Sequence, residues 1–205
     1  MQFLEISGVG NRAENLDYHT SYISEKTKYF MVVDGYRTER DFLVKYSNKI
    51  MLEKINKKGN SLLKILKKFV PENVNMSFVF LEIEGKNVKI SHAGDCRVYI
   101  DGELETDDQS VAWSKLNKRG KSKEEISTLV CDHPQRNILT NSIKKRNKTE
   151  DINLKEINIT LSESEVLLCT DGFWSKNHLN IKNKKLYLNE EIKYSDNYTA
   201  IIINL

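Results

Sequence analysis

The sequence predicts an α+β protein in which sheets and helices pack in layers. Short runs with strand character recur from one end of the chain to the other, and two regions with helical spacing of apolar residues interrupt them. No Gly/Ser-rich linker or repeat divides the 205 residues, a length sufficient to bury the core of one domain. We therefore expect a single layered domain over residues 1–205.

The first part of the chain has strand patterns. Apolar and polar residues alternate in residues 3–7 and again in 18–23, a period typical of half-buried strands. Residues 29–33 (YFMVV) form a continuous apolar run, which at this length indicates a buried strand rather than a helix. The polar stretch 24–28 is expected to join the last two strands as a hairpin.

Helical spacing follows in residues 38–57, where apolar side chains recur every three to four positions until Gly59-Asn60. A second, shorter helix is predicted over 61–69. Residues 76–83 and 88–93 flank the turn Glu84-Gly85-Lys86-Asn87 and predict a hairpin.

The second half repeats this alternation of strands and helices. A strand over 97–100 is turned by Asp101-Gly102, and helices are predicted over 109–118 and 123–130. Further strands are expected over 156–161, 166–170 and 198–204. The 24 residues between Asp171 and Asp196 show little helical patterning, so we expect little helix there.

Composition excludes several classes of protein. No apolar run approaches the roughly 18 residues of a membrane span, and the start lacks the layout of a secretory signal. We expect a cytoplasmic protein without membrane contact. The three cysteines, Cys96, Cys131 and Cys169, lie far apart and are expected to be buried apolar residues rather than zinc ligands or disulfides.

Charge and aromatic residues point to an ordinary surface and core. The chain has 32 basic and 29 acidic residues and a net charge of +3. Basic clusters such as Lys144-Lys145-Arg146 alternate with acids along the chain, which favours solvated surfaces over a nucleic-acid-binding stripe. Binding of nucleic acid is the weaker alternative, and it would require affinity that falls steeply with salt. Trp113 and Trp174 are expected to anchor the core.

The most informative feature is a set of aspartates at the ends of predicted strands. Asp34 and Asp171 each follow an apolar run and precede a glycine, Asp95 follows residues 90–94, and Asp196 precedes the last strand. Carboxylates at buried strand ends lose hydration and repel one another unless cations neutralise them. Each Asp-Gly or Asp-Asn pair alone is more often a turn, but four together favour a site for Mg²⁺ or Mn²⁺.

Five motifs, in this order, resemble those of the bacterial metal-dependent serine/threonine phosphatases of type 2C. They are residues 10–17 (GNRAENLD), 32–35 (VVDG), 93–99 (AGDCRVY), 169–174 (CTDGFW) and 196–199 (DNYT). Residues 106–110 and 132–140 resemble the segment between the third and fourth motifs. The match covers nearly the whole chain, and the resemblance implies two stacked antiparallel sheets flanked by helices, a four-layer α-β-β-α sandwich.

The resemblance also implies a centre of two Mn²⁺ or Mg²⁺ ions, with a third, weaker ion in bacterial relatives, at which a metal-bound water attacks phosphorus. The resemblance implies that the substrate is a protein phosphorylated by a serine/threonine kinase. It also implies that the enzyme acts as a monomer. The implied roles are metal binding by Asp34, the Gly35 carbonyl, Asp171, Asp196 and Asp95, orientation of water by Asp17, and phosphate binding by Arg12.

The sequence departs from the family pattern at two places that bear on activity. Leu16 stands where the family has a glutamate ligand of the second ion, so that this ion binds weakly or uses Glu14 or Asp17. The segment Tyr36-Arg37-Thr38 replaces a small residue or histidine followed by glycines, and Arg37 is either a phosphate-attracting residue at the cleft or a solvated side chain. The alternative function is therefore a pseudophosphatase that binds a partner or phosphoprotein without turnover.

Overall fold

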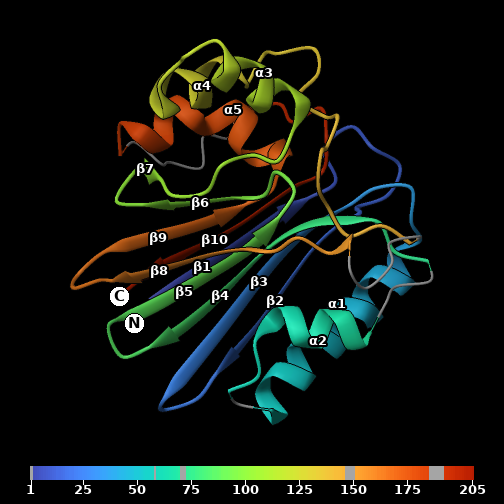
Figure 1. Ribbon diagram of the computed structural model, residues 1–205, viewed down its shortest axis with the longest axis vertical. Coiled ribbons are helices and arrows are strands. Elements are labelled where there is room, and N and C mark those ends of the chain that lie inside the picture. The colour runs from blue at the N-terminus through green and yellow to red at the C-terminus, as the bar shows by residue number, and fades with distance from the viewer. Residues whose placement is uncertain (1, 58, 70–72, 146–150, 185–191) are drawn as a thin grey trace.

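The computed structural model describes residues 2–57, 59–69, 73–145, 151–184 and 192–205, so Arg146 of the basic cluster lies outside the described residues. Two antiparallel sheets stack face to face, and helices cover the outer side of each (Figure 1). The predicted four-layer α-β-β-α sandwich is confirmed.

One sheet contains, in spatial order, β2 (Asp17–Ile23), β3 (Thr27–Gly35), β4 (Met76–Glu84), β5 (Asn87–Ala93) and β8 (Lys155–Thr160). These strands match the predicted ones within two residues. Asp34 was expected just after its strand. It lies within β3, opposite Asp17 of β2 in the antiparallel register.

The other sheet contains, in spatial order, β1 (Gln2–Gly8), β10 (Tyr198–Asn204), β9 (Glu165–Cys169), β6 (Arg97–Ile100) and β7 (Glu103–Leu104). The last strand of the chain lies between the first strand and β9. Gly8 is therefore the register partner of Tyr198, which brings the loop after β1 next to the segment that contains Asp196.

Helices α1 (Arg40–Asn56) and α2 (Leu62–Lys68) cover the first sheet, and α3 (Val111–Lys118), α4 (Lys123–Leu129) and α5 (Asp171–Lys182) cover the second (Figure 1). Ser61, Ser110 and Ser122 cap α2, α3 and α4 by accepting a hydrogen bond from a backbone amide three residues further on. Within the described residues, no helix is both long and apolar enough to cross a membrane.

Helix α5 corrects the prediction of little helix after Asp171. Its buried face carries Phe173, Trp174, Asn177, His178 and Ile181, which are spaced as one face of a helix. Two of the five are polar, so the apolar periodicity that marks an amphipathic helix is broken. The polar pair is buried because other parts of the chain supply hydrogen-bond partners.

Apolar side chains fill three spaces between the four layers. Along β3, Tyr29, Met31 and Val33 face α1 and α2, whereas Phe30 and Val32 face the other sheet. The third core lies between the second sheet and α3, α4 and α5, and it includes Trp113 and Trp174, as predicted. Cys96 and Cys169 are buried as expected, but Cys131 is only partly buried because it follows α4 near the surface.

Candidate active site and metal centre

A cleft of about 1220 Å³ opens at one end of the two sheets. Strands β3, β5 and β9 end there, and β2, β6 and β10 begin there. The cleft is lined by the following residues proposed from the sequence: Arg12, Asp34, Gly35, Asp95, Asp171 and Asp196. Glu14 and Leu16 also line it. The topology thus gathers residues from distant parts of the chain in one place.

Asp17 and Asp34 are held by the pairing of β2 with β3. The Gly35 amide donates a hydrogen bond to the Leu16 carbonyl at 3.0 Å. A Cβ atom at position 35 would lie only 2.7 Å from that oxygen and from Leu43. Glycine is therefore required where the two backbones approach each other.

Asp95 lies in a tight turn whose backbone is held by two polar side chains. The Asp95 and Cys96 amides both donate to Ser77 Oγ, at 2.8 and 3.0 Å, and the Gly94 amide donates to Gln109 Oε1 at 2.8 Å. The buried Asp95 Oδ1 has no hydrogen-bond partner among the described residues. An orphaned carboxylate oxygen of this kind is costly unless a cation binds it.

Asp171 is the first residue of α5, and its position depends on the segment before β10. A Cβ atom on Gly172 would lie 1.8 Å from the Asn197 carbonyl oxygen, so only glycine permits this close packing. Thr170 Oγ1 donates to Asp17 Oδ2 at 2.6 Å and accepts from the Thr199 amide at 2.9 Å. Thr170 thereby connects the two sheets at the cleft.

The loop that carries Arg12 is fixed by Asn197. Its Oδ1 accepts from the Leu16 amide, and its Nδ2 donates to the carbonyls of Val9 and Glu14, each at 2.9 Å. Three hydrogen bonds from one side chain hold both ends of residues 9–16. In the sequence Asn197 stands out only as part of the motif 196–199, because nothing in its local sequence indicates these partners.

Burial and mutual repulsion make the carboxylates of the cleft hard to ionise. Burial, and then the charges of Asp171 and Asp17, raise the pKa of Asp34 well above its ordinary value. Burial together with nearby carboxylates raises the pKa values of Asp17 and Asp95 to about 8. The pKa of Asp171 is raised chiefly by burial, against the opposing charge of Arg136. Without a bound cation, ionisation of these carboxylates is therefore costly.

Two arginines supply positive charge near the carboxylates of the cleft. Arg12 forms a bidentate pair with Asp196, with Nε–Oδ1 and Nη2–Oδ2 distances of 2.8 and 2.7 Å, and its pKa is raised by that carboxylate. Arg136 Nη1 lies 3.8 Å from Asp171 Oδ2 and has no hydrogen-bond partner within the described residues. Sequence reasoning missed Arg136, although it had noted residues 132–140 as a motif.

The carboxylates fit hard divalent cations that keep part of their water. In the described part of the chain, no three carboxylate, imidazole or thiolate groups stand close enough to enclose an ion by themselves. Mg²⁺ characteristically binds through one or two carboxylates and retains several waters. A complete protein shell is therefore not needed, and the orphaned Asp95 oxygen together with the partly paired Asp171 supplies oxygen ligands of the required kind.

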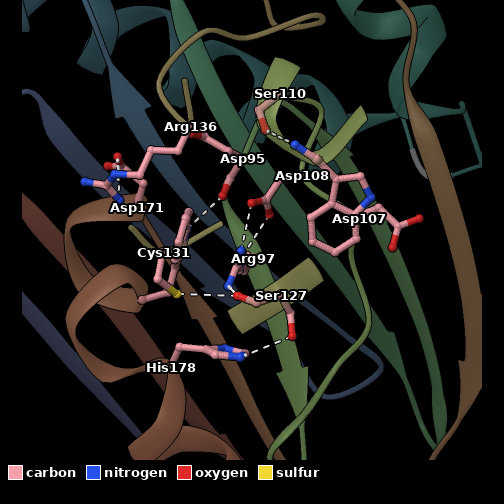
Figure 2. A network of polar contacts seen from close by, with 12 residues as sticks. Asp95, Arg97, Asp107, Asp108, Ser110, Ser127, Cys131, Arg136, Asp171 and His178 are labelled. Atoms are coloured by element: carbon pink, nitrogen blue, oxygen red, sulfur yellow. Dashed lines mark hydrogen bonds and ion pairs between the residues drawn. The ribbon is translucent and has the colours of Figure 1, made fainter. Parts of the chain in front are cut away.

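A buried polar network supports the site from behind (Figure 2). Arg97 forms a bidentate pair with Asp108, at 2.8 Å for both contacts. The Arg97 guanidinium also lies 3.5 Å above the Trp174 ring. Trp174 Nε1 donates to the Asp95 carbonyl at 2.9 Å. The network thus connects the core beneath α4 and α5 with the turn that carries Asp95.

The same network explains the polar face of α5. His178 Nδ1 lies 3.0 Å from Tyr99 Oη. On the other side of the ring, Nε2 lies 3.2 Å from Ser127 Oγ (Figure 2). Burial, and then the charge of Arg97, lower the pKa of His178 to about 4. The imidazole therefore stays neutral at physiological pH and serves as a structural hydrogen-bonding group, not as a metal ligand.

Two stacked antiparallel sheets flanked by helices are the fold of the bacterial serine/threonine phosphatases. Stp1 from Staphylococcus aureus is similar with a TM-score of 0.76 and 18% identity, over 100% of this chain and 94% of that one. The S. agalactiae serine/threonine phosphatase gives 0.71 and 17%, over 98% of both chains.

A third similar structure is the catalytic domain of the serine/threonine protein phosphatase PstP in complex with two manganese ions. Its TM-score is 0.67 and its identity 15%, over 98% of this chain and 96% of that one. The sequence itself matches no protein-family model and no curated protein. The resemblance noted in the motifs is thus confirmed in the fold.

Proposed function

We propose that residues 1–205 form one phosphatase domain that hydrolyses phosphoserine and phosphothreonine in proteins with the help of Mn²⁺ or Mg²⁺. The observation that carries this proposal is the convergence of Asp34, Asp95, Asp171 and Asp196 on one cleft, where burial and mutual repulsion oppose the ionisation of Asp34 and Asp95. Such a cluster is stable in its ionised form only with cations beside it.

In this proposal Asp34, the Gly35 carbonyl, Asp171 and Asp196 would supply oxygen ligands for two ions, with bound waters completing each shell. Asp95 would hold a third, weaker ion. The ions supply an activated water and neutralise charge on the phosphoryl group. Asp17, which accepts the Thr170 hydrogen bond and lies opposite Asp34, orients water at the edge of the cluster.

Arg12 is the residue that we assign to the substrate phosphate. Its side chain is 58% exposed and already holds a carboxylate through two parallel hydrogen bonds. The same planar fork matches two oxygens of a phosphate. A phosphate that binds there replaces Asp196 as the partner of the guanidinium, so the carboxylate becomes free to bind a cation.

The substrate class is inferred from the proteins with this fold, whose names are those of serine/threonine phosphatases. We infer that the substrate is a protein phosphorylated by a serine/threonine kinase and that the enzyme acts as a monomer. The three free cysteines suit a reducing compartment, which supports a place in the cytoplasm.

The first test measures turnover of an aryl phosphate, with manganese binding followed by calorimetry. We expect hydrolysis in Mn²⁺ or Mg²⁺, complete loss with a chelator, and recovery when excess metal is returned. Turnover that chelation leaves unchanged would contradict metal dependence. Saturable metal binding without turnover at any concentration would favour the pseudophosphatase instead.

The second test concerns Leu16, which lines the cleft at the position of the missing glutamate ligand. We expect Leu16→Glu to tighten manganese binding by about tenfold or more, which corresponds to about 1.4 kcal/mol. Leu16→Gln is the matched control, because it has the same length and polarity without the negative charge. Equal affinities of the two variants would refute a charge effect at this position.

A further inference from the structure

The cleft has a basic wall beside its acidic floor. Arg37, Lys144 and Lys145 line the same cleft as Asp34 and Asp171, and all three side chains are exposed. Among the residues that the structure describes, none of the three basic groups has an ion-pair partner. Three cations are therefore available to a ligand that occupies the cleft.

The backbone under this wall is fixed on both sides. Asn75 Nδ2 donates to the Arg37 carbonyl at 3.0 Å, and Asn75 Oδ1 accepts from the Lys145 amide at 3.2 Å. The Lys144-Lys145 segment is also attached to the start of β4, because Met76 and Ile143 exchange backbone hydrogen bonds of 2.9 and 3.0 Å. One asparagine thus connects two basic segments that are more than a hundred residues apart.

Arg37 has an unusual backbone conformation for an arginine. Its φ is +50°, in the left-handed region that disfavours residues with a Cβ atom. Strain of this kind persists where the surroundings enforce it and is common at ligand-binding sites. The preceding Tyr36 contributes to the constraint, since its hydroxyl lies 2.7 Å from Ser142 Oγ.

We propose that Arg37, Lys144 and Lys145 form a subsite for negative charge that flanks the phosphorylated residue of the substrate, and this inference rests on the proposed phosphatase function. The flanking charge is either a carboxylate or a second phosphate. The acidic floor repels such groups unless cations lie beside it, and basic groups at the rim of a site chiefly steer and select charged ligands. Because the backbone is already fixed, binding costs little ordering of the wall.

The test compares three phosphoserine peptides of equal length, one with neutral flanks, one with glutamates and one with a second phosphoserine. For the parent chain we expect kcat/KM to be at least about fivefold higher for a charged peptide than for the neutral one. Exposed ion pairs are individually weak, so this preference is the combined effect of the three basic groups. The Lys144→Ala/Lys145→Ala and Arg37→Ala variants should lose this preference through KM and keep their turnover of an aryl phosphate.

The matched control is Lys26→Ala/Lys86→Ala, which removes two exposed lysines from the turns at the far end of the first sheet. It should keep the full preference. Preference for the glutamate peptide, the doubly phosphorylated peptide or both supports the subsite and identifies the source of the charge. Equal kcat/KM values for all three peptides, or an equal loss in the control, would overturn it.

Turnover of the aryl phosphate distinguishes failure of the proposed phosphatase function from failure of the subsite. If neither the aryl phosphate nor any peptide is hydrolysed, the phosphatase assignment fails, and fluorescence anisotropy of labelled peptides then tests the subsite by binding alone. Tighter binding of a charged peptide by the parent, lost in the two wall variants, supports the subsite. Equal binding of charged and neutral peptides refutes it.

Discussion

Asp34→Asn is expected to abolish turnover while making the metal-free protein more stable. Loss of a metal ligand removes several kcal/mol of transition-state stabilisation, and about 4 kcal/mol corresponds to about a thousandfold in rate. Without metal, the same change removes one of several partly or fully buried carboxylates that repel one another. The carboxylates of the proposed site therefore lower the stability of the metal-free protein while they serve catalysis.

The sign of the pH dependence follows from the raised pKa values. Asp17 and Asp95 have pKa values of about 8 in the folded chain and near 4 when unfolded. Between these values the folded state binds more protons, so the stability of the metal-free protein falls as pH rises from about 4 to 8. Added Mn²⁺ should reverse this loss at pH 8, because it binds the ionised carboxylates of the folded state.

The measurement is thermal unfolding at pH 8 with chelator and with Mn²⁺, alongside aryl phosphate turnover. For metal-free Asp34→Asn we expect a Tm at least about 2 °C above that of the parent, the shift for roughly 1 kcal/mol in a chain of this size, and little further rise with Mn²⁺. Glu163→Gln, an exposed carboxylate-to-amide change remote from the cleft, should behave like the parent. A variant less stable than the parent without metal would contradict the proposed repulsion.

Asp108→Asn is expected to destabilise the protein more than any surface change. Arg97 and Asp108 are paired with side chains 0% and 1% exposed. Burial, the largest single effect, lowers the pKa of Arg97, but the charge and hydrogen bonds of Asp108 together with those of Tyr99 outweigh it and raise the pKa. Removal of one partner of a buried pair leaves an uncompensated charge and costs about 3–5 kcal/mol. Because Arg97 stacks on Trp174, which binds the Asp95 carbonyl, metal affinity should fall as well.

The matched control is the neighbouring Asp107→Asn. Asp107 forms ion pairs with Lys123 and Lys155 at 3.1 and 3.9 Å, but its side chain is 40% exposed, so the expected loss is below about 1 kcal/mol. The double variant Arg97→Met/Asp108→Leu should recover much of the stability lost in Asp108→Asn, since a buried pair can be replaced by apolar groups of similar volume. Urea unfolding of the four proteins measures these differences, and equal losses at positions 107 and 108 would refute the role of burial.

The positions of most strands and helices were predictable because their signals are local. The alternation that divides β3 between Tyr29, Met31 and Val33 on one face and Phe30 and Val32 on the other follows from the two-residue repeat of any strand. The turn residues between β4 and β5 are likewise adjacent in the chain. Helix α5 was missed because Asn177 and His178 take buried positions that hydrogen-bond partners such as Tyr99, Ser127 and Tyr194 make tolerable.

The candidate site likewise has features that local sequence predicts and features that it does not. Aspartates at strand ends and their glycines were identifiable as residue types at particular local positions, and Arg12 was identifiable through the family resemblance of residues 10–17. The pairing of Arg12 with Asp196, the approach of Arg136 to Asp171 and the three hydrogen bonds of Asn197 were not. Each joins side chains from separate segments, and local pattern carries no information about such a partner.

The sequence by itself determined most of the segments that become strands and helices and which strand ends carry carboxylates, because backbone sterics and apolar periodicity act over a few residues. Only the tertiary structure decided that β10 lies between β1 and β9 and that Asp17 faces Asp34. Strand order and register are set by packing of whole faces against each other, with partners such as Gly8 and Tyr198 lying 190 residues apart. The cleft exists because that packing brings strand ends from both sheets to one place.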